Sequence, residues 1–453
     1  MNYSRLLQVQ REFFLTQQTK TVEYRKEKLL KLKTIIQQNE KLLYEAIYKD
    51  FGKSETETYL TEIAFVYNEI DYFLKNLHRL SRPEKVSTNL PNLPGKSRII
   101  YEPLGCILII GAWNYPYQLT LSPLVAAMAS GNCCIVKPSE IPQHTMLALE
   151  KIINENFADR YVHVIRGGVE ETTELLKLRF DKIFFTGSTR VGKIVYEAAA
   201  RNLVPVTLEL GGKSPVFVTQ HADIDVAARR IVWGKFLNAG QTCIAPDYIY
   251  VHESIRSRLL EKLKLYIEKF CYTAGSSHYV CIINAKNFER LTRLLQPEKI
   301  YYGGTVAAEK NYIAPTLIYP AEWSDPVMQE EIFGPLLPVL TYTDLYETFD
   351  EILEREKPLS AYIFTGNKSE KELFRNTLSF GGGCINDVLM HISNGNLPFG
   401  GVGFSGTGNY HGKFGFECFS HPKAVLERAT WGEPMLKYPP YTETKFRWLK
   451  KLL

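Results

Sequence analysis

The 453-residue sequence lacks the cysteine patterns of secreted and zinc-binding proteins. Its eight cysteines are scattered, and no two of them form a CxxC pair. Such spacing argues against a disulfide scaffold and against a structural metal site. The first residues also lack the apolar core that defines a signal peptide. We therefore expect a cytoplasmic protein that holds no metal.

A strong excess of charge of either sign is missing as well, since the net charge is only +5. This balance gives no reason to predict nucleic acid as a partner. An uncharged stretch does exist at 104–136, but Asn114, Pro116 and Pro123 interrupt it. The basic residues 448–453 are too few to span a bilayer, which takes about 20 apolar residues in a helix. We expect no integral membrane segment.

The composition, with 45% hydrophobic and 23% charged residues, is typical of a globular chain of two or three domains. Residues 4–80 have helical periodicity, and the proline-rich segment 82–101 is typical of a linker or an extended arm. From residue 103 onward, short apolar strands alternate with helices, which predicts a parallel α/β sheet. The predicted strands are 106–110, 133–136, 182–186, 206–210, 216–218 and 248–252, and the predicted helices are 119–129, 145–156 and 191–201.

Two turns that follow predicted strands have the composition of a nucleotide site. The first contains Gly187, Ser188 and Gly192 and leads into a helix, whose N-terminus suits a pyrophosphate. The second contains Lys137 and Glu140 at the carboxyl end of a strand, a position from which side chains bind ribose hydroxyls. Taken alone, the first is more typical of an ordinary strand–helix connection and the second of a solvated turn.

Two further residues are candidates for covalent chemistry. Cys243 lies on a predicted loop, where a favoured thiolate would make it a nucleophile. Its alternative interpretation is an inert core cysteine. Glu209 ends an apolar strand, and a buried carboxyl group there would act as a general base near neutral pH. Its alternative interpretation is an ion pair with Lys213.

Taken together and in order, these motifs resemble the aldehyde dehydrogenases, and most closely their class 3 branch. The resemblance covers roughly residues 20–445. The tail motifs YHGK at 410–413 and FSHPK at 419–423 resemble class 3 in particular. The other matching motifs are WNYP at 113–116, KPSE at 137–140, FTGS at 185–188, ELGGK at 209–213, GQTC at 240–243, EEIFGP at 330–335 and LPFGG at 397–401.

The resemblance implies an α/β fold with three parts. A parallel, doubly wound cofactor domain would comprise 1–81 and 103–209, and an α/β catalytic domain would comprise 210–420. A small β arm for oligomerisation would comprise 82–102 and 421–445. Class 3 relatives are typically homodimers, so we expect a homodimer here.

The resemblance also implies a reaction, the oxidation of an aldehyde to a carboxylic acid with hydride transfer to NAD(P)+. The Cys243 thiolate would attack the aldehyde and form a thiohemiacetal and then a thioester. The Asn114 amide and the Cys243 N–H would hold the oxyanion, and Glu209 would activate the hydrolytic water. Medium or long aliphatic aldehydes and aromatic aldehydes both suit the resemblance.

The cofactor site follows from the same resemblance. Lys137 and Glu140 match residues that hold the adenosine ribose, and Glu331 matches the acid that holds the nicotinamide ribose. Because a carboxylate at 140 repels the 2′-phosphate of NADP, we expect NAD as cofactor, with NADP as the second possibility. The implied cofactor-binding positions are Trp113, Lys137, Glu140, Gly187, Ser188, Gly192, Glu331 and Phe333.

Two rival functions are weaker. A CoA-acylating or phosphorylating relative would usually lack the glutamate that Glu209 matches. A non-catalytic protein on the same scaffold would have no need for Cys243 and Asn114. The sequence therefore predicts a hydrolytic aldehyde dehydrogenase.

Overall fold

The N-terminal residues form amphipathic helices, as their periodicity predicts. The computed structural model describes residues 2–433 and 435–452. Leu29, Leu32, Ile36, Leu43 and Ile47 are all fully buried, so one apolar face of these helices packs onto the protein core. The helices are α1 (Tyr3–Leu15), α2 (Val22–Gln38), α3 (Glu40–Phe51), α4 (Glu55–Thr58) and α5 (Ala64–Leu80), with a π-helical turn, η2 (Tyr59–Ile63), before α5.

The first sheet has six strands in the order β17-β7-β6-β3-β4-β5, and all neighbours are parallel except β17 and β7. From β5 to β7 this is the strand order 3-2-1-4-5 of a doubly wound dinucleotide-binding sheet, whose switch point lies between β3 and β6. The doubly wound parallel fold is confirmed. The strands are β3 (Cys106–Ile110), β4 (Cys133–Lys137), β5 (Val162–Val164), β6 (Lys182–Thr186), β7 (Val206–Glu209) and β17 (Gly406–Thr407).

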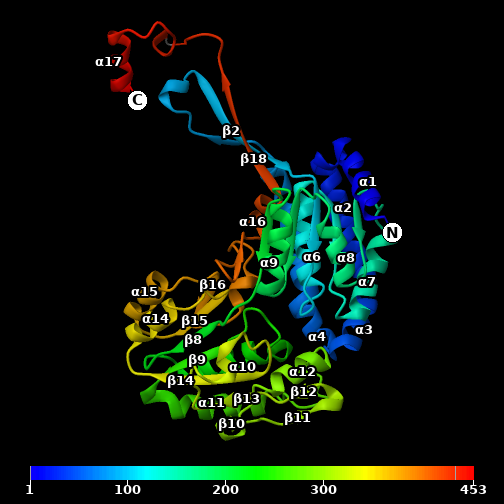
Figure 1. The fold of residues 1–453 in the computed structure, drawn as a ribbon, viewed down its shortest axis with the longest axis vertical. Helices are drawn as coiled ribbons and strands as arrows, with labels where there is room; N and C mark the ends of the chain where they lie inside the picture. The colour runs from blue at the N-terminus through cyan, green and yellow to red at the C-terminus, as the bar shows by residue number, and fades with distance from the viewer. Residues whose placement is uncertain (1, 434, 453) are drawn as a thin grey trace.

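Helices cover this sheet on its faces (Figure 1). All 13 residues of α6 are buried, which explains the uncharged stretch around it. The predicted helices agree with α6, α7 and α9, whereas β5 and α8 were not predicted. The covering helices are α6 (Gln118–Ser130), α7 (Gln143–Asn154), α8 (Val169–Leu176) and α9 (Thr189–Ala200).

The second sheet has seven strands in the order β10-β13-β14-β9-β8-β15-β16, and only β10 runs antiparallel to its neighbour. Its strands are β8 (Pro215–Val218), β9 (Tyr248–His252), β10 (Ile300–Tyr302), β13 (Thr316–Ile318), β14 (Leu336–Tyr342), β15 (Ser360–Phe364) and β16 (Gly382–Ile385). Its longer helices are α10 (Ile224–Phe236), α11 (Arg256–Lys269), α12 (Ala285–Thr292), α14 (Leu345–Leu353) and α15 (Lys368–Thr377). The short elements are α13 (Pro326–Gln329) and the hairpin of β11 (Val306–Ala307) and β12 (Tyr312–Ile313).

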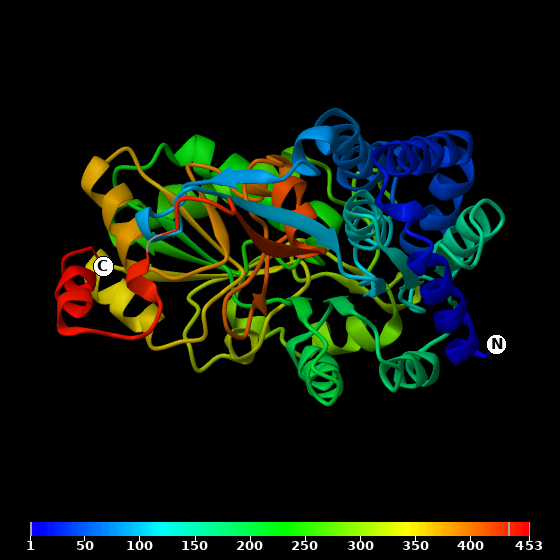
Figure 2. The same ribbon diagram turned by 90° about the horizontal axis from the view of Figure 1, so that it is seen from above.

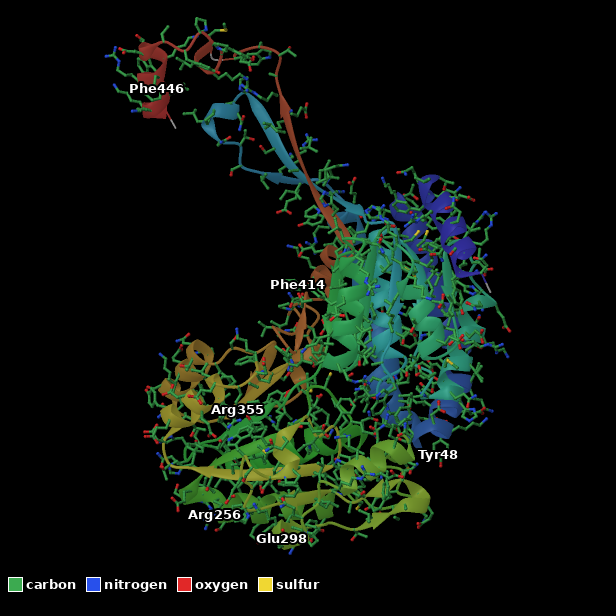
Figure 3. The ribbon with its side chains drawn as sticks, viewed as in Figure 1. Tyr48, Arg256, Glu298, Arg355, Phe414 and Phe446 are labelled. Carbon is green, nitrogen blue, oxygen red and sulfur yellow. The ribbon has the colours of Figure 1, made fainter. Side chains whose placement is uncertain are left out.

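A three-stranded antiparallel ribbon extends away from both units (Figure 1). It consists of β1 (Glu84–Val86), β2 (Gly95–Pro103) and β18 (Ser420–Arg428), so the proline-rich segment is an arm. The terminal helix α17 (Glu443–Leu452) lies at its far end, where Phe446 projects (Figure 3), and Figure 2 shows α17 opposite the N-terminal helix. Within 2–433 and 435–452, no helix is both long and apolar enough to cross a membrane.

Residues 406–418 pack on the first sheet and its helices. The sequence grouped residues 406–418 with the second unit, but β17 pairs with β7 of the first sheet. The next helix, α16 (Gly412–Cys418), packs against α5 and α6, and its Phe414 lies at the base of the arm (Figure 3). The chain therefore returns to the first unit before it enters the arm.

Candidate active site

A strained loop presents Cys243 between the 3-10 turn η4 (Leu237–Gly240) and β9. Asn238, Ala239 and Gly240 all have positive φ, at 54°, 51° and 73°. A side chain at Gly240 would approach the Gly334 carbonyl oxygen to 2.3 Å, so only glycine fits there. Backbone strain of this kind persists where the surrounding structure holds it, and it is common at active sites.

Asn114 lies directly against this loop. Its Nδ2 donates to the Gln241 carbonyl oxygen at 3.0 Å, and the Asn238 amide donates to the Asn114 carbonyl oxygen at 2.9 Å. Gln241 is fixed in turn by donating to the Asn238 carbonyl at 3.0 Å. Among the described residues only Gln241 accepts from the Asn114 amide, so one N–H remains for a ligand. The structure thus brings Asn114 and the Cys243 loop together.

Cys243 also lines a large cavity of about 930 Å³. Helical segments from both units supply its wall, and Glu57 and Lys269 are among the few charged residues on it. A largely apolar cavity of this size suits a drug-sized or lipid-like ligand. The main apolar lining residues are Leu60, Leu119, Trp233, Phe270, Leu389, Ile392 and Phe399. Asn114 and Glu209 do not line this cavity.

The thiol of Cys243 is held in its neutral form. Burial raises its pKa well above the usual range, and the nearby Glu331 and Glu209 carboxylates raise it further. Backbone N–H groups of Cys243 and Ile244 act in the opposite direction. The thiolate therefore needs a proton acceptor or a positive charge beside it.

Glu209 is the most desolvated acid near the cysteine. It is 2% exposed, and neither carboxylate oxygen has a hydrogen-bond partner among the described residues. Burial alone raises its pKa well above the ordinary value. The alternative ion pair with Lys213 does not form, because the Lys213 ammonium contacts Asp247 at 2.5 Å and the Glu330 carbonyl at 2.9 Å.

Glu331, Phe333 and Trp113 approach the loop from other elements. Burial, with the Asp247 charge, raises the pKa of Glu331 to about 8. A side chain at Gly211 would lie 2.1 Å from a Glu331 oxygen, so this carboxyl group packs directly on the backbone. The Phe333 ring meets the Trp113 ring edge to face at 5.3 Å. The structure thus places the Phe333 and Trp113 rings in contact and the Glu331 carboxyl group against the Gly211 backbone.

Lys137 ends β4 with a buried ammonium group. Its side chain is 1% exposed, its Nζ donates to the Pro138 carbonyl oxygen at 2.7 Å, and a Glu140 oxygen lies 3.7 Å away. Burial lowers the Lys137 pKa, while the charges of Glu140 and Glu171 raise it. Glu171 was not predicted. The sequence signal that could have found it is its position three residues after Gly168, the spacing of a capping box. The Gly168 N–H donates to the Glu171 carboxylate at 2.6 Å.

Gly187, Ser188 and Gly192 form the turn from β6 into α9. Ser188 is the N-cap of α9, where its Oγ accepts from an N–H at 3.4 Å. A side chain at Gly187 would lie 2.6 Å from the Phe185 ring, and one at Gly192 would lie 2.7 Å from Leu210. Packing of α9 on the sheet thus explains Gly192, whereas the Phe185 ring of the preceding strand explains Gly187.

These residues fit a dinucleotide. Lys137 and the N-terminus of α9 lie at the carboxyl ends of β4 and β6, on either side of the switch strand β3. The buried ammonium makes one short hydrogen bond and keeps further donors for hydroxyl groups. The helix N-terminus offers free N–H groups to a phosphate. Within 2–433 and 435–452, no cluster of three or more His, Cys, Asp and Glu side chains could hold a metal ion.

The sequence matches the aldehyde dehydrogenase family over residues 3–425. The chain belongs to this family. The enzyme is 48% identical to 4,4′-diaponeurosporen-aldehyde dehydrogenase of Staphylococcus aureus, over 97% of this chain and 96% of the relative. It is 45% identical to the dimeric NADP-preferring aldehyde dehydrogenase of Mus musculus, over 97% and 98%.

Solved structures agree with this assignment. The substrate-bound Staphylococcus aureus AldH superimposes on the enzyme with a TM-score of 0.97 at 46% identity, covering 100% of this chain and 99% of that one. Family 3 member A2 of Rattus norvegicus is 44% identical over 99% of the chain and 94% of the relative, which confirms the class 3 resemblance. The enzyme is therefore an oxidoreductase that oxidises aldehydes with NAD(P)+.

Proposed function

We propose that the enzyme converts aldehydes to carboxylic acids through a covalent intermediate on Cys243. The observation that carries this proposal is the position of Cys243 in the wall of an apolar cavity. The Cys243 loop is hydrogen-bonded to Asn114, and the Glu209 and Glu331 carboxyl groups lie near the thiol. An apolar aldehyde in the cavity meets the sulfur there. The cysteine thus belongs to the cavity wall and also lies near the Glu209 and Glu331 carboxyl groups.

The first step is loss of the Cys243 thiol proton to solvent water, followed by addition of the resulting thiolate to the aldehyde carbon. The free N–H of Asn114 and the backbone N–H of Cys243 stabilise the oxygen that gains negative charge. When bound, NAD(P)+ would accept the hydride that leaves the adduct, and loss of this hydride would turn the adduct into a thioester. Covalent capture helps catalysis because it converts the planar carbonyl carbon into a tetrahedral carbon, from which a hydride can leave.

The second step is hydrolysis. Glu209 accepts a proton from water while the water oxygen adds to the thioester carbon. The carbon–sulfur bond then breaks, which releases the acid and restores the Cys243 thiolate. A desolvated carboxylate is a stronger base than one in water, and the buried position of Glu209 supports this role.

The substrate class we propose is a long, apolar aldehyde. The cavity volume of about 930 Å³ and its apolar wall favour such a ligand over a small polar one. The Staphylococcus aureus relative is named for 4,4′-diaponeurosporen-aldehyde. Aromatic aldehydes are the second candidate, because Trp233 and Phe270 line the same cavity.

We propose NAD as the preferred cofactor. Glu140 lies beside Lys137 at the predicted ribose site, and its charge disfavours a 2′-phosphate. The mouse relative is named as NADP-preferring, which makes NADP the second candidate. We also propose that the arm formed by 82–102 and 421–445 joins two copies into a homodimer, that 1–81 and 103–209 bind the cofactor, and that catalysis belongs mainly to 210–420.

The test of the nucleophile is Cys243→Ala. Oxidation of a long aliphatic aldehyde is expected to fall by at least about 10⁴-fold, because no thiolate remains to capture the carbonyl carbon. Binding of NAD, measured by calorimetry, is expected to persist. Cys271→Ala is the matched control, since that cysteine lines the same cavity. Near-normal turnover in Cys243→Ala would show that another residue is the nucleophile.

The test of the base is Glu209→Gln. The burst of NADH formed in the first turnover is expected to remain, whereas steady turnover falls by about 10²–10⁴-fold, the range for a general base. Rapid mixing with NADH absorbance measures both phases. A second assay adds coenzyme A or phosphate to the unaltered enzyme, and faster turnover with either would favour the acyl-transfer rival. Loss of the burst in Glu209→Gln would contradict the hydrolytic role.

A further inference from the structure

Several buried hydroxyl and carboxyl groups have no hydrogen-bond partner among residues 2–433 and 435–452, and three of them come from β6, β7 and the segment after β17. These three belong to Glu209, Thr186 and Tyr410. The exposed fractions of the three residues are 2%, 7% and 0%. Buried polar atoms are normally hydrogen-bonded, either to protein or to ordered water. If the three groups lie close together, one shared hydrogen-bond partner would explain why none of them is paired within the protein.

The register of the first sheet puts two of them side by side. Thr186 of β6 pairs with Glu209 of β7, and Phe184 pairs with Thr207. Paired residues of neighbouring strands point to the same face, and so do residues two apart along a strand. Phe184, Thr186, Thr207 and Glu209 consequently share one face of the sheet.

Tyr410 covers this face. Its ring meets the Phe184 ring edge to face, with the centroids 5.0 Å apart. The chain reaches Tyr410 directly from β17, where Gly406 pairs with Glu209. Helix α9 packs on the opposite face, where Gly192 meets Leu210. The phenol and the Glu209 carboxyl group therefore lie on the same side of the sheet.

The protonation states in this pocket are complementary. Burial raises the pKa of the Tyr410 phenol, and the Glu209 carboxylate raises it further, so the phenol keeps its proton and can donate it in a hydrogen bond. Burial raises the pKa of Glu209 because nothing in the described protein compensates its charge. Hydroxyl donors lower the free energy of an ionised carboxylate.

We propose that the Tyr410 and Thr186 hydroxyls hold water against the Glu209 carboxyl group and stabilise its ionised form. The inference rests on the proposed role of Glu209 as the base of thioester hydrolysis. Tyr410 is a positioning residue in this scheme, because Glu209 and not Tyr410 accepts the proton. Water in the pocket satisfies all three groups and stands next to the acid that activates it.

Other titratable groups face the pocket from several elements. Burial raises the pKa values of the Cys243 and Cys418 thiols, so both stay neutral near pH 7. Cys418 of α16 lies 3.3 Å from the Thr207 hydroxyl. Lys182 of β6 lies beside Cys418, and the Glu69–His411 pair lies behind Tyr410, with 3.7 Å between its nearest atoms. Glu209 is the group whose ionisation a hydroxyl donor would shift.

The test is Tyr410→Phe, which removes one oxygen and keeps the ring that packs on Phe184. Cys243 is acylated with p-nitrophenyl acetate, and intact-mass measurement follows the lifetime of the acetyl-enzyme between pH 6 and pH 9. We expect the lifetime near pH 7 to lengthen about tenfold and the acid limb of hydrolysis to move to higher pH by about one unit. The rate of acylation is expected to stay unchanged.

Two comparisons make the result specific. Tyr342→Phe is the matched control, because Tyr342 of β14 also has a buried hydroxyl without a partner in the described residues, but in the second sheet. It is expected to leave the lifetime and the pH profile unchanged. Thr186→Val removes the second hydroxyl and is expected to move the acid limb in the same direction as Tyr410→Phe.

The proposed role of Glu209 and the proposed role of the two hydroxyls can be disproved separately. If Glu209→Gln leaves the acetyl-enzyme as short-lived as in the unaltered enzyme, the proposed function of Glu209 is wrong. If Glu209→Gln prolongs it while Tyr410→Phe and Thr186→Val both keep the original lifetime and pH profile, only the pocket is wrong. An equal change in Tyr342→Phe would also overturn the inference, since it would show a general effect of losing a buried hydroxyl.

Discussion

At the residue scale, three charges lie together at the proposed ribose site, and our proposal for the cofactor preference rests on them. Lys137 is buried, whereas the Glu140 side chain is 44% exposed and 3.7 Å from the ammonium. Glu171 adds a second negative charge to the surroundings of Lys137. A 2′-hydroxyl can donate to a carboxylate, but a 2′-phosphate would meet a negative charge. This balance of charges is the reason why we propose NAD, the cofactor without the 2′-phosphate.

Glu140→Gln tests this balance. The variant keeps the size of the side chain and removes its charge, so the ratio of kcat/KM for NAD to that for NADP is expected to fall about tenfold. Steady-state kinetics with each cofactor measure the ratio. Glu155→Gln, an equal charge change just beyond the end of α7, is expected to leave it unaltered. An unchanged ratio in Glu140→Gln would remove Glu140 from the ribose site.

The sequence indicates where the candidate site residues lie along the chain, but it does not indicate which residues they contact. Cys243 and Asn114 lie in loops recognisable by their glycine and proline neighbours, and the structure brings these loops together. The alternative ion pair of Lys213 could not be decided from the sequence, because its partner, Asp247, is 34 residues away. Tyr410 was unpredictable as a neighbour of Glu209 for the same reason. Only the return of the chain through β17 brings it there.

At the scale of elements, the N-terminus of α6 depends on a buried acid. The Glu62 carboxylate accepts from the backbone N–H groups of Tyr117 at 2.7 Å and Gln118 at 3.3 Å. Its other oxygen lies 2.9 Å from the Lys53 ammonium, and both side chains are fully buried. That ammonium is 4.6 Å from the centre of the Tyr115 ring. Glu62 thus anchors the segment that carries Asn114.

Glu62→Gln is expected to lower the free energy of unfolding by about 3–5 kcal/mol, because Lys53 keeps a buried charge without a partner. The urea midpoint measured by circular dichroism should fall accordingly. Glu45→Gln is the control. Its 4.0 Å pair with Lys41 is exposed, so the change should stay within about 0.5 kcal/mol. A midpoint for Glu62→Gln equal to that of the control would contradict the anchoring role.

Strands with continuous apolar sequence were predicted almost to the residue. The predicted strands 106–110, 182–186 and 248–252 have the observed bounds because every strand of a covered parallel sheet is buried on both faces. β5 was missed because three residues, Val162–Val164, are too few to give a period. Helix α8 was missed because it has only one fully buried side chain, Leu175, and so has no apolar stripe.

At the scale of the whole molecule, the arm has a strand edge and apolar side chains that the described residues of the same chain leave exposed to solvent. β2 and β18 pair along nine residues, from Ser420 with Pro103 to Arg428 with Gly95, and the ribbon projects beyond both units (Figure 1). β18 is an edge strand with unpaired backbone groups. Exposed apolar side chains on the arm include Val86, Leu90, Leu93, Val425, Leu426 and Trp431. We propose that a second copy of the same chain covers them, since symmetric homodimers are the commonest oligomers of soluble proteins.

Val425 and Leu426 are 38% and 45% exposed, and as neighbours in a strand they point to opposite faces of the ribbon. Sedimentation of the unaltered enzyme is expected to give twice the 51.9 kDa of one chain. The double variant Val425→Lys, Leu426→Lys would bury two unpaired charges in the dimer contact. We expect its dissociation constant to rise by at least about thirtyfold, since each anchor residue of an interface contributes about 2 kcal/mol. Leu203→Lys, on a side chain 92% exposed outside the arm, should remain dimeric. A monomer of the unaltered enzyme at micromolar concentration, or a double variant that stays dimeric, would contradict the arm as the contact between copies.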